Sequence, residues 1–136
     1  IFIDDYAHHP TEIQKLIEVC KLFKKKDFFL IIEPHRFSRL NDLYSDYIRI
    51  LKNTKNLIIL KTYSAGENFE KNMKNSKNLV NDLNVLSHNK VSYLDTYEEL
   101  FKLLDNLIAT TNNKIIVSAG AGSISAQMRF FYESRK

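Results

Sequence analysis

Short apolar runs alternate with longer stretches of helical periodicity along the whole chain of 136 residues. The short runs predict β-strands and are Ile1 to Ile3, Phe28 to Glu33, Leu57 to Leu60, Val91 to Leu94 and Ile115 to Val117. Stretches with apolar residues three and four positions apart predict helices and are Thr11 to Lys25, Leu40 to Leu51, Ser76 to Leu86, Leu100 to Ile108 and Ser123 to Tyr132. Strands that alternate with helices require crossover connections, so the pattern predicts an α/β fold. We expect a Rossmann-like three-layer sandwich, with helices flanking a mainly parallel sheet of about five or six strands.

Two helix starts carry local signals. Pro10 stands where the first helix begins, and proline is favoured in a first helical turn. Thr96 to Glu99 has the form of a capping box, with Thr96 as the N-cap and Glu99 bonding back to it. We therefore interpret the residues after the fourth strand as a helix cap.

Composition narrows the classes of protein to consider. A hydrophobic fraction of 44% is ordinary for one folded domain, and the longest apolar run, Phe28 to Ile32, is far shorter than the roughly 20 residues of a membrane span. The single cysteine, Cys20, excludes an intrachain disulfide and fits the cytoplasm. Because the chain starts with Ile within a strand, we expect it to be part of a longer protein.

The basic residues do not point to nucleic acid. The formal net charge is only +4, and the one dense basic run is Lys24 to Lys26. We place this run at the C-terminal end of the first helix, where cations meet the negative end of the helix dipole. A nucleic-acid patch is the weaker alternative, because no aromatic or arginine residues interleave with the lysines.

The chemically loaded residues cluster where strands end. Residues 4–10 (DDYAHHP) follow the first strand, 33–39 (EPHRFSR) the second, 62–67 (TYSAGE) the third and 119–123 (AGAGS) the fifth. Parallel sheets bind ligands beyond the carboxyl ends of their strands. The sequence therefore predicts a binding site at this edge.

The first of these segments holds two carboxylates, a phenol and two imidazoles. Helix capping needs one such side chain, so we favour a functional role. A metal site at His8 and His9 is the alternative, but adjacent residues of an extended loop point apart and no His-rich helix supports them. We expect no metal site here.

The second segment carries Arg36 and Arg39, with His35 beside them. Guanidinium groups suit bidentate capture of a carboxylate or a phosphate. Two solvated surface arginines are the alternative. We favour an anion site, because we expect this segment to lie beside the first one, on the adjacent strand.

The segment after the fifth strand, Gly120 to Ser123, resembles half of a dinucleotide fingerprint. Ser125 stands where the third glycine would fall, and the motif follows the last strand, so it is a weak nicotinamide signature. A tight turn that exposes backbone N–H groups at a helix N-terminus is the better interpretation. A phosphoacceptor receiver domain is excluded, because neither the required Asp after the third strand nor the Lys after the fifth is present.

Four strings together resemble the C-terminal domain of the Mur ligase family. They are DDYAHHPTE at 4–12, PHRFSR at 34–39, YSAGE at 63–67 and GAG at 120–122, in the order of the family. The resemblance covers the whole chain, 1–136, and is nearest to the branch that joins L-alanine to UDP-N-acetylmuramate. It implies a cytoplasmic bacterial ligase of peptidoglycan synthesis. In that reaction ATP, with Mg²⁺, phosphorylates the muramic acid carboxylate, and the alanine amine attacks the acyl phosphate.

The resemblance also implies roles for individual residues. Tyr6, His8, Arg36 and Arg39 would bind L-alanine, the arginines through its carboxylate, and Asp5 would bind the ATP ribose. His9, His35, Gly120, Gly122 and Ser123 would line the pocket. No catalytic residue and no metal ligand is expected in this chain.

The N-terminal UDP-binding domain and the central ATPase domain of the family would act in cis. No Gly-x-x-x-x-Gly-Lys-Ser/Thr occurs here, so we expect the isolated chain to fold and to have no ligase activity. Two alternatives remain open, a murein tripeptide recycling ligase and a stand-alone α/β module that binds a nucleotide or an anion. We expect no membrane partner.

Overall fold

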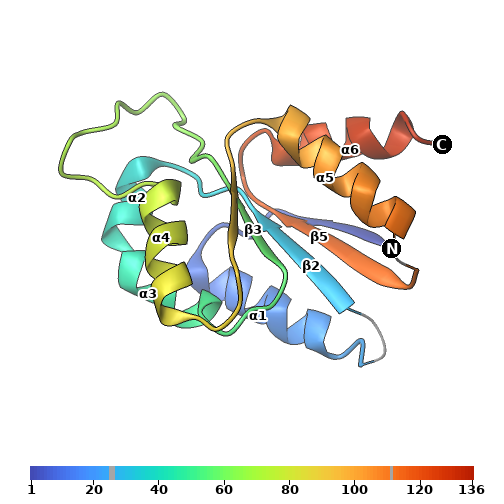
Figure 1. Cartoon of the computed structure of the whole chain (residues 1–136). Helices are drawn as coiled ribbons and strands as arrows, with labels where there is room; N and C mark the ends of the chain where they lie inside the picture. The colour runs from blue at the N-terminus through green and yellow to red at the C-terminus, as the bar shows by residue number, and fades with distance from the viewer. Residues whose placement is uncertain (25–26, 111) are drawn as a thin grey trace.

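The computed structural model describes residues 1–24, 27–110 and 112–136. Within these described residues, five parallel strands form one sheet in the order β1-β5-β2-β3-β4 (Figure 1). The strands are β1 (Phe2–Asp5), β2 (Asp27–Ile32), β3 (Leu57–Leu60), β4 (Ser92–Leu94) and β5 (Lys114–Ala119). The helices are α1 (Pro10–Lys21), α2 (Phe37–Asp42), α3 (Tyr44–Leu51), α4 (Ser76–Leu86), α5 (Tyr97–Thr110) and α6 (Ile124–Glu133). The predicted α/β sandwich is confirmed.

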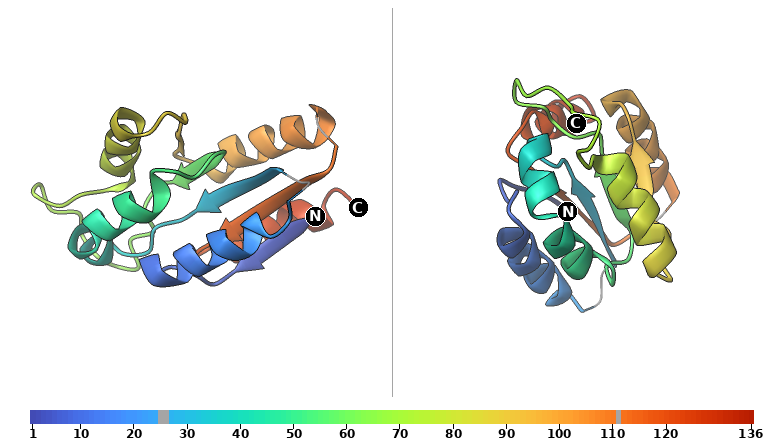
Figure 2. Two further views of the ribbon diagram at one scale, coloured as in Figure 1. Left: turned by 90° about the horizontal axis from the view of Figure 1, so that it is seen from below. Right: turned by 90° about the vertical axis from the view of Figure 1, so that its left-hand side faces the viewer.

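Alternation along the central strands builds two separate cores. In β2, Leu30 and Ile32 pack under α1, α3 and α4, whereas Ile31 packs under α5 and α6. The same alternation in β3 and β5 extends both cores across the sheet. Helices therefore cover both faces, as the two views of Figure 2 show. Strands buried on both sides read as continuous apolar runs, which is why the sequence predicted them well.

Several element boundaries differ from the sequence prediction. The strand β1 runs on to Asp5, because Asp4 and Asp5 pair with Ser118 and Ala119 of β5. These two carboxylates therefore project from the strand and not from the loop after it.

The first helix also ends earlier than the apolar pattern predicted. It stops at Lys21, four residues short, because the chain turns back into β2 at Asp27. Lys24 thus lies beyond the helix, and Lys25 and Lys26 lie outside the described residues.

The stretch from Leu40 to Leu51 is two helices and not one. Helices α2 and α3 meet at Leu43, whose backbone is not helical (φ −106°, ψ 17°). The apolar stripe continues across the break, since Leu43 and Tyr44 both pack against the first core. Periodicity therefore could not reveal the break.

The predicted neighbour relation of the first two strands was wrong. Strand β5 lies between β1 and β2 and pairs with both. The last strand thus lies inside the sheet, next to the edge strand β1, which sequence order alone does not indicate. The segments after β1 and β2 still meet, because both run out over the carboxyl end of β5.

The helix starts predicted at Pro10 and Thr96 are present in the structure. Glu99 N donates to Thr96 Oγ1 over 3.2 Å, and Thr96 N donates to Glu99 Oε2 over 3.2 Å, so the predicted capping box is present. Pro10 opens α1 as expected. Across the described residues, the structure contains no helix with the length and apolar character to cross a membrane.

Candidate functional site

Two polar clusters occupy the carboxyl end of the sheet. We call the first the arginine cluster, which consists of Tyr6, His8, His35, Arg36 and Arg39. We call the second the glutamate cluster, which consists of Glu33, Tyr97, Ser123 and the first turn of α6. Both contain residues that the sequence predicted, but their hydrogen bonding differs.

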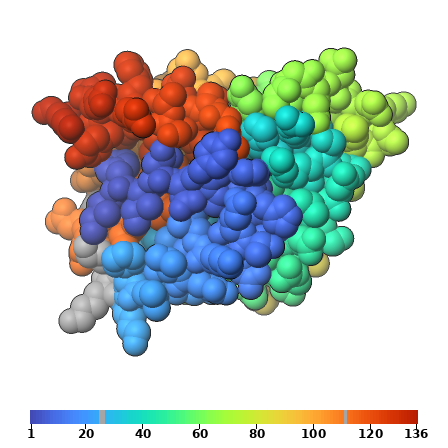
Figure 3. All heavy atoms as spheres, turned by 180° about the vertical axis from the view of Figure 1, so that it is seen from behind, coloured from blue at the N-terminus to red at the C-terminus, as the bar shows by residue number. Residues whose placement is uncertain are grey.

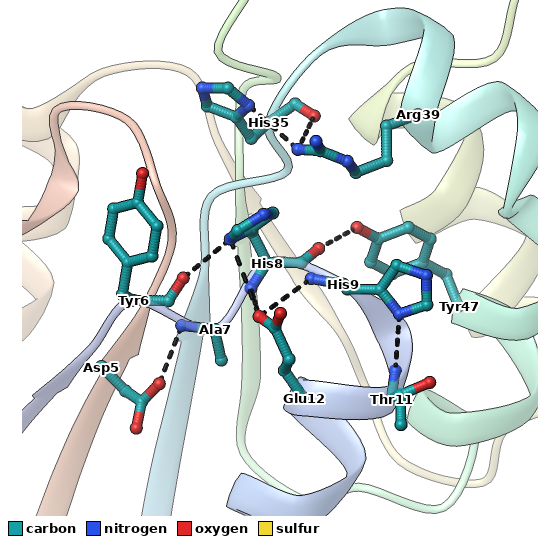
Figure 4. A network of polar contacts seen from close by, with 10 residues as sticks. All are labelled: Asp5, Tyr6, Ala7, His8, His9, Thr11, Glu12, His35, Arg39 and Tyr47. Atoms are coloured by element: carbon teal, nitrogen blue, oxygen red, sulfur yellow. Dashed lines mark hydrogen bonds and ion pairs between the residues drawn. The ribbon is translucent and has the colours of Figure 1, made fainter.

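The segment after β1 is held in place by the start of α1. The backbone N–H groups of His8 and His9 donate to Glu12 Oε2 over 3.1 and 3.5 Å, and these bonds hold the pKa of Glu12 below its usual value. The Tyr47 hydroxyl donates to the carbonyl oxygen of His8. Asp5 Oδ1 accepts from the N–H of Ala7 over 2.8 Å (Figure 4). The segment between β1 and α1 is therefore fixed by hydrogen bonds to the end of β1, to α1 and to α3.

The two histidines of this loop have different surroundings. The Nδ1 atom of His9 accepts from the N–H of Thr11 over 3.2 Å, so His9 is the N-cap of α1. The His8 ring turns the other way, edge-on to the Tyr6 ring at 5.3 Å between centroids and 6.0 Å from the His35 ring (Figure 4). His8 thus joins the arginine cluster, while His9 supports the helix. The first loop and the α2–α3 region lie side by side on the surface (Figure 3).

His35 and Arg39 form a direct pair. The Arg39 guanidinium donates through Nη1 to His35 Nδ1 over 3.1 Å and to the His35 carbonyl oxygen over 3.4 Å. Because a guanidinium only donates, Nδ1 must be the acceptor and the imidazole is neutral. Burial, followed by the charges of Arg39, His8 and Arg36, lowers the pKa of His35. The pair keeps the half-buried Arg39 charge in place without neutralising it.

Arg36 sits on an unusual backbone. Its φ of 72° lies in the left-handed region that non-glycine residues rarely adopt. Its N–H donates to the carbonyl oxygen of Tyr63 over 2.8 Å, and the N–H of Tyr63 donates to the carbonyl oxygen of Pro34 over 2.8 Å. The His35 and Tyr63 rings stack at 5.4 Å between centroids. The segment after β3 therefore supports the arginine cluster.

The arginine cluster is open and cationic. Within the part of the chain that the structure describes, neither Arg36 nor Arg39 forms an ion pair with a carboxylate. Arg36 is exposed, and the Tyr6 side chain is 70% exposed. The arrangement can accept a small anion beside aromatic and imidazole rings.

The glutamate cluster is closed. Glu33 is only 3% exposed; its carboxylate accepts from the Tyr97 hydroxyl and, over 3.2 Å, from the N–H of Ile124 in α6. Burial raises the pKa of Glu33 above its usual value, although these hydrogen bonds oppose the shift. Burial and the Glu33 carboxylate raise the pKa of Tyr97. A cavity of about 150 Å³ adjoins Glu33 and Tyr97.

The glycine turn packs onto this carboxylate. A Cβ at Gly122 would lie 2.4 Å from Glu33 Oε1 and 2.6 Å from Tyr63 Cγ, and one at Gly120 would lie 2.8 Å from Ile124 Cγ2. The sequence indicated a turn with backbone N–H groups free for a ligand. Instead, the Glu33 carboxylate already occupies the N-terminus of α6.

Glu33 stands where the second predicted strand meets the polar segment 33–39, and Tyr97 stands within the predicted capping box, so the sequence did not indicate that they are partners. They lie 64 positions apart, and no local pattern links them. No role was predicted for Glu12 or Glu67. A His N-cap hides the capping box of Glu12, since serine, threonine, aspartate and asparagine are the usual signals.

Asp5 lies at the end of β1, half-buried, and its one hydrogen-bonded carboxylate oxygen is turned to Ala7. Among residues 1–24, 27–110 and 112–136, no three His, Cys, Asp or Glu side chains gather in a geometry that could hold a metal ion. The described residues therefore offer no metal centre.

The sequence profile of the family described as "Mur ligase, glutamate ligase domain" matches residues 1–122. The chain is 37% identical over 123 residues to a UDP-N-acetylmuramate–L-alanine ligase of Wigglesworthia glossinidia brevipalpis, covering 90% of the chain and 25% of that relative. It is 36% identical over 129 residues to the enzyme of the same name from Pelagibacter ubique, covering 94% of the chain and 27% of that relative. A relative of this name from Carboxydothermus hydrogenoformans is 28% identical over 125 residues, covering 92% of the chain and 26% of that relative. The chain thus spans about a quarter of the length of the curated relatives it matches.

Proposed function

The chain belongs to the Mur ligase family, and we propose that it is the C-terminal domain of an ATP-dependent ligase that joins L-alanine to UDP-N-acetylmuramate. In this proposal it supplies the amino-acid side of an active site that is completed in cis by a UDP-binding and an ATPase domain. The reaction belongs to peptidoglycan precursor synthesis in the bacterial cytoplasm.

One observation carries the assignment of the amino-acid side. Arg36 and Arg39 have no carboxylate partner among the described residues and lie beside a neutral His35 at the carboxyl end of β2. We propose that they bind the alanine carboxylate, with Tyr6 and His8 beside the small side chain. The cluster is too open to enclose an amino acid alone, which fits a second wall from another domain.

The nucleotide side of the site involves the carboxylate of Asp5. We propose that Asp5 contacts the ATP ribose through the carboxylate that ends β1. The described residues do not form a Mg²⁺ site, and the sequence lacks a P-loop lysine, so we assign no phosphoryl-transfer step to this chain. Mg²⁺ and the phosphate groups would be bound by the central domain.

His9 and the Gly120 to Ser123 turn have a supporting role in this proposal. His9 caps α1, and the turn packs on Glu33. We propose that they shape the wall behind the pocket and make no bond to the amino acid.

The proposed function can be tested by comparing substrates that supply the acceptor amine. The full-length ligase that contains this chain should form an amide between UDP-N-acetylmuramate and free L-alanine, with ATP hydrolysed in step. A preference for a murein tripeptide would identify a recycling ligase instead; anion binding without amide formation would favour the stand-alone module. The isolated chain of 136 residues should fold and form no amide, and measurable amide formation by it would contradict the division of labour proposed here.

A further inference from the structure

A long loop between β3 and α4 runs along helix α2. It covers residues 61–75 and extends past α2 before it leads into α4 (Figure 1). The Phe69 ring packs on the Phe37 ring at 5.1 Å between centroids, and the N–H of Lys74 donates to Asn41 Oδ1 over 3.2 Å. The loop thus contacts both the N-terminal and the C-terminal end of α2.

Glu67 also contacts α2, through two hydrogen bonds with Ser38. Its Oε2 accepts from the N–H of Ser38 over 3.0 Å, and its Oε1 accepts from the Ser38 hydroxyl over 2.5 Å. These bonds, together with the charge of Arg36, lower the pKa of Glu67. The carboxylate is therefore ionised at neutral pH and holds Ser38 at two points.

Ser38 lies between the two arginines of the arginine cluster. Arg36, two residues before it, needs outside support for its φ of 72°, because such a strained backbone persists only where the neighbouring structure fixes it. Tyr63 supplies that support on one side through the N–H of Arg36. Glu67 supplies it on the other side through Ser38.

We propose that Glu67 is a positioning residue for the arginine pair. By fixing Ser38, it sets the backbone from which both guanidinium groups reach the carboxylate of the amino-acid substrate. This inference rests on the proposed function. It assigns to the loop a role in amino-acid affinity, although Glu67 itself does not bind the substrate.

A second effect of Glu67 works in the opposite direction. Its negative charge partly offsets Arg36, so its loss by itself would strengthen anion binding. Positioning and charge therefore predict opposite changes in the KM for alanine. Glu67→Gln separates them, because the amide can accept from the Ser38 N–H and donate to the Ser38 hydroxyl while it removes the charge.

The experiment measures KM for alanine and for ATP, and kcat, in the full-length ligase. Glu67→Ala should raise the alanine KM by about three- to tenfold with little change in the ATP KM, because a residue that acts through another transmits only part of a charged hydrogen bond. Glu67→Gln should restore most of the affinity. Glu70→Ala removes the same charge from an exposed position of the same loop; it is the matched control and should behave as wild type.

Ser38→Ala provides a second variant if Glu67→Ala does not fold. It keeps the N–H bond to Glu67 and should raise the alanine KM less than Glu67→Ala. An unchanged alanine KM in Glu67→Ala, an equal rise in the Gln variant, or a fall in both would overturn the positioning role. Arg39→Ala distinguishes a failure of the positioning role from a failure of the proposed carboxylate site. If it raises the alanine KM and Glu67→Ala does not, only the positioning role fails; if neither does, the proposed carboxylate site fails as well.

Discussion

The arginine and glutamate clusters lie at the same edge of the sheet and differ in what satisfies their polar groups. The buried carboxylate of Glu33 is met by Tyr97 and the first turn of α6. The guanidinium group of Arg39 is held by His35, that of Arg36 is exposed, and neither has a carboxylate partner within the described residues. A carboxylate whose hydrogen bonds are made within the fold is not free for a ligand, whereas guanidinium groups without a carboxylate partner are available to one.

Tyr63 connects the two clusters. Its ring stacks on His35 on the arginine side and packs against Gly122 on the glutamate side. The glutamate cluster therefore lies directly behind the arginine cluster, with the Tyr63 ring between them. We therefore predict that substitutions in the arginine cluster will change substrate affinity and that substitutions in the glutamate cluster will change stability.

The largest effect should follow loss of an arginine. Arg36→Ala or Arg39→Ala in the full-length ligase should raise the alanine KM roughly ten- to hundredfold, because each removes a charge-assisted hydrogen bond worth about 1.5–3 kcal/mol. Steady-state kinetics should show a much smaller change in the ATP KM. Equal changes for both substrates would mean that the arginines do not discriminate between them.

Gly122→Ala should act on stability. The new Cβ would lie 2.4 Å from Glu33 Oε1 and 2.6 Å from Tyr63 Cγ, so the buried carboxylate and the tyrosine ring must shift. Overpacking of this kind costs about 1–3 kcal/mol, which urea unfolding of the 136-residue chain would measure. Gly66→Ala serves as the comparison, because its new methyl group would have no atom within 4 Å. Any loss of stability there would come from backbone strain at its φ of 83° and not from crowding. Wild-type stability in Gly122→Ala would show that the glutamate cluster is not tightly packed.

Glu33→Gln should change how stability depends on pH. Burial raises the pKa of Glu33 in the folded state, so the folded chain binds this proton more tightly than the unfolded chain does. Stability from this group is greatest below the usual pKa of 4.5 and is lost as the pH rises through the raised value. The difference in unfolding free energy between Glu33→Gln and wild type should therefore shift in favour of the variant as the pH rises from 4 to 7. A constant difference would contradict the raised pKa.

The smallest effect is expected at Glu12. Glu12→Ala removes the acceptor for the N–H groups of His8 and His9 and should lower stability by about 0.5–1 kcal/mol, the usual range for a helix cap. Glu12→Gln retains an acceptor and should recover most of that loss in the same unfolding experiment. A full loss in both variants would point to the charge and not to the hydrogen bonds.

Much of the fold could be predicted because the central strands are apolar on both faces. Strand β3 and helix α4 begin and end where the sequence placed them. The position of β5 between β1 and β2 could not be predicted, since strand order depends on contacts between distant residues. The break at Leu43 was hidden for another reason, because the apolar stripe continues through it.

The candidate site could be predicted in part. The sequence placed Arg36, Arg39 and His8 at one edge, and the structure brings both His8 and Arg39 to His35. It could not show that Glu33 fills the N-terminus of α6, because a buried acid within an apolar run looks like the end of a strand. The family profile confirms the resemblance, and the roles of individual residues in binding remain predictions.

The most direct test of the carboxylate site compares L-alanine with L-alaninamide as the acceptor in the full-length ligase. The amide keeps the amine and the methyl group and replaces the carboxylate by a neutral group. Wild type should prefer alanine strongly in kcat/KM, and the Arg36→Ala and Arg39→Ala variants should lose most of that preference while their activity with alaninamide changes little. An undiminished preference for alanine in both variants would contradict the assignment of the arginine cluster to the amino-acid carboxylate.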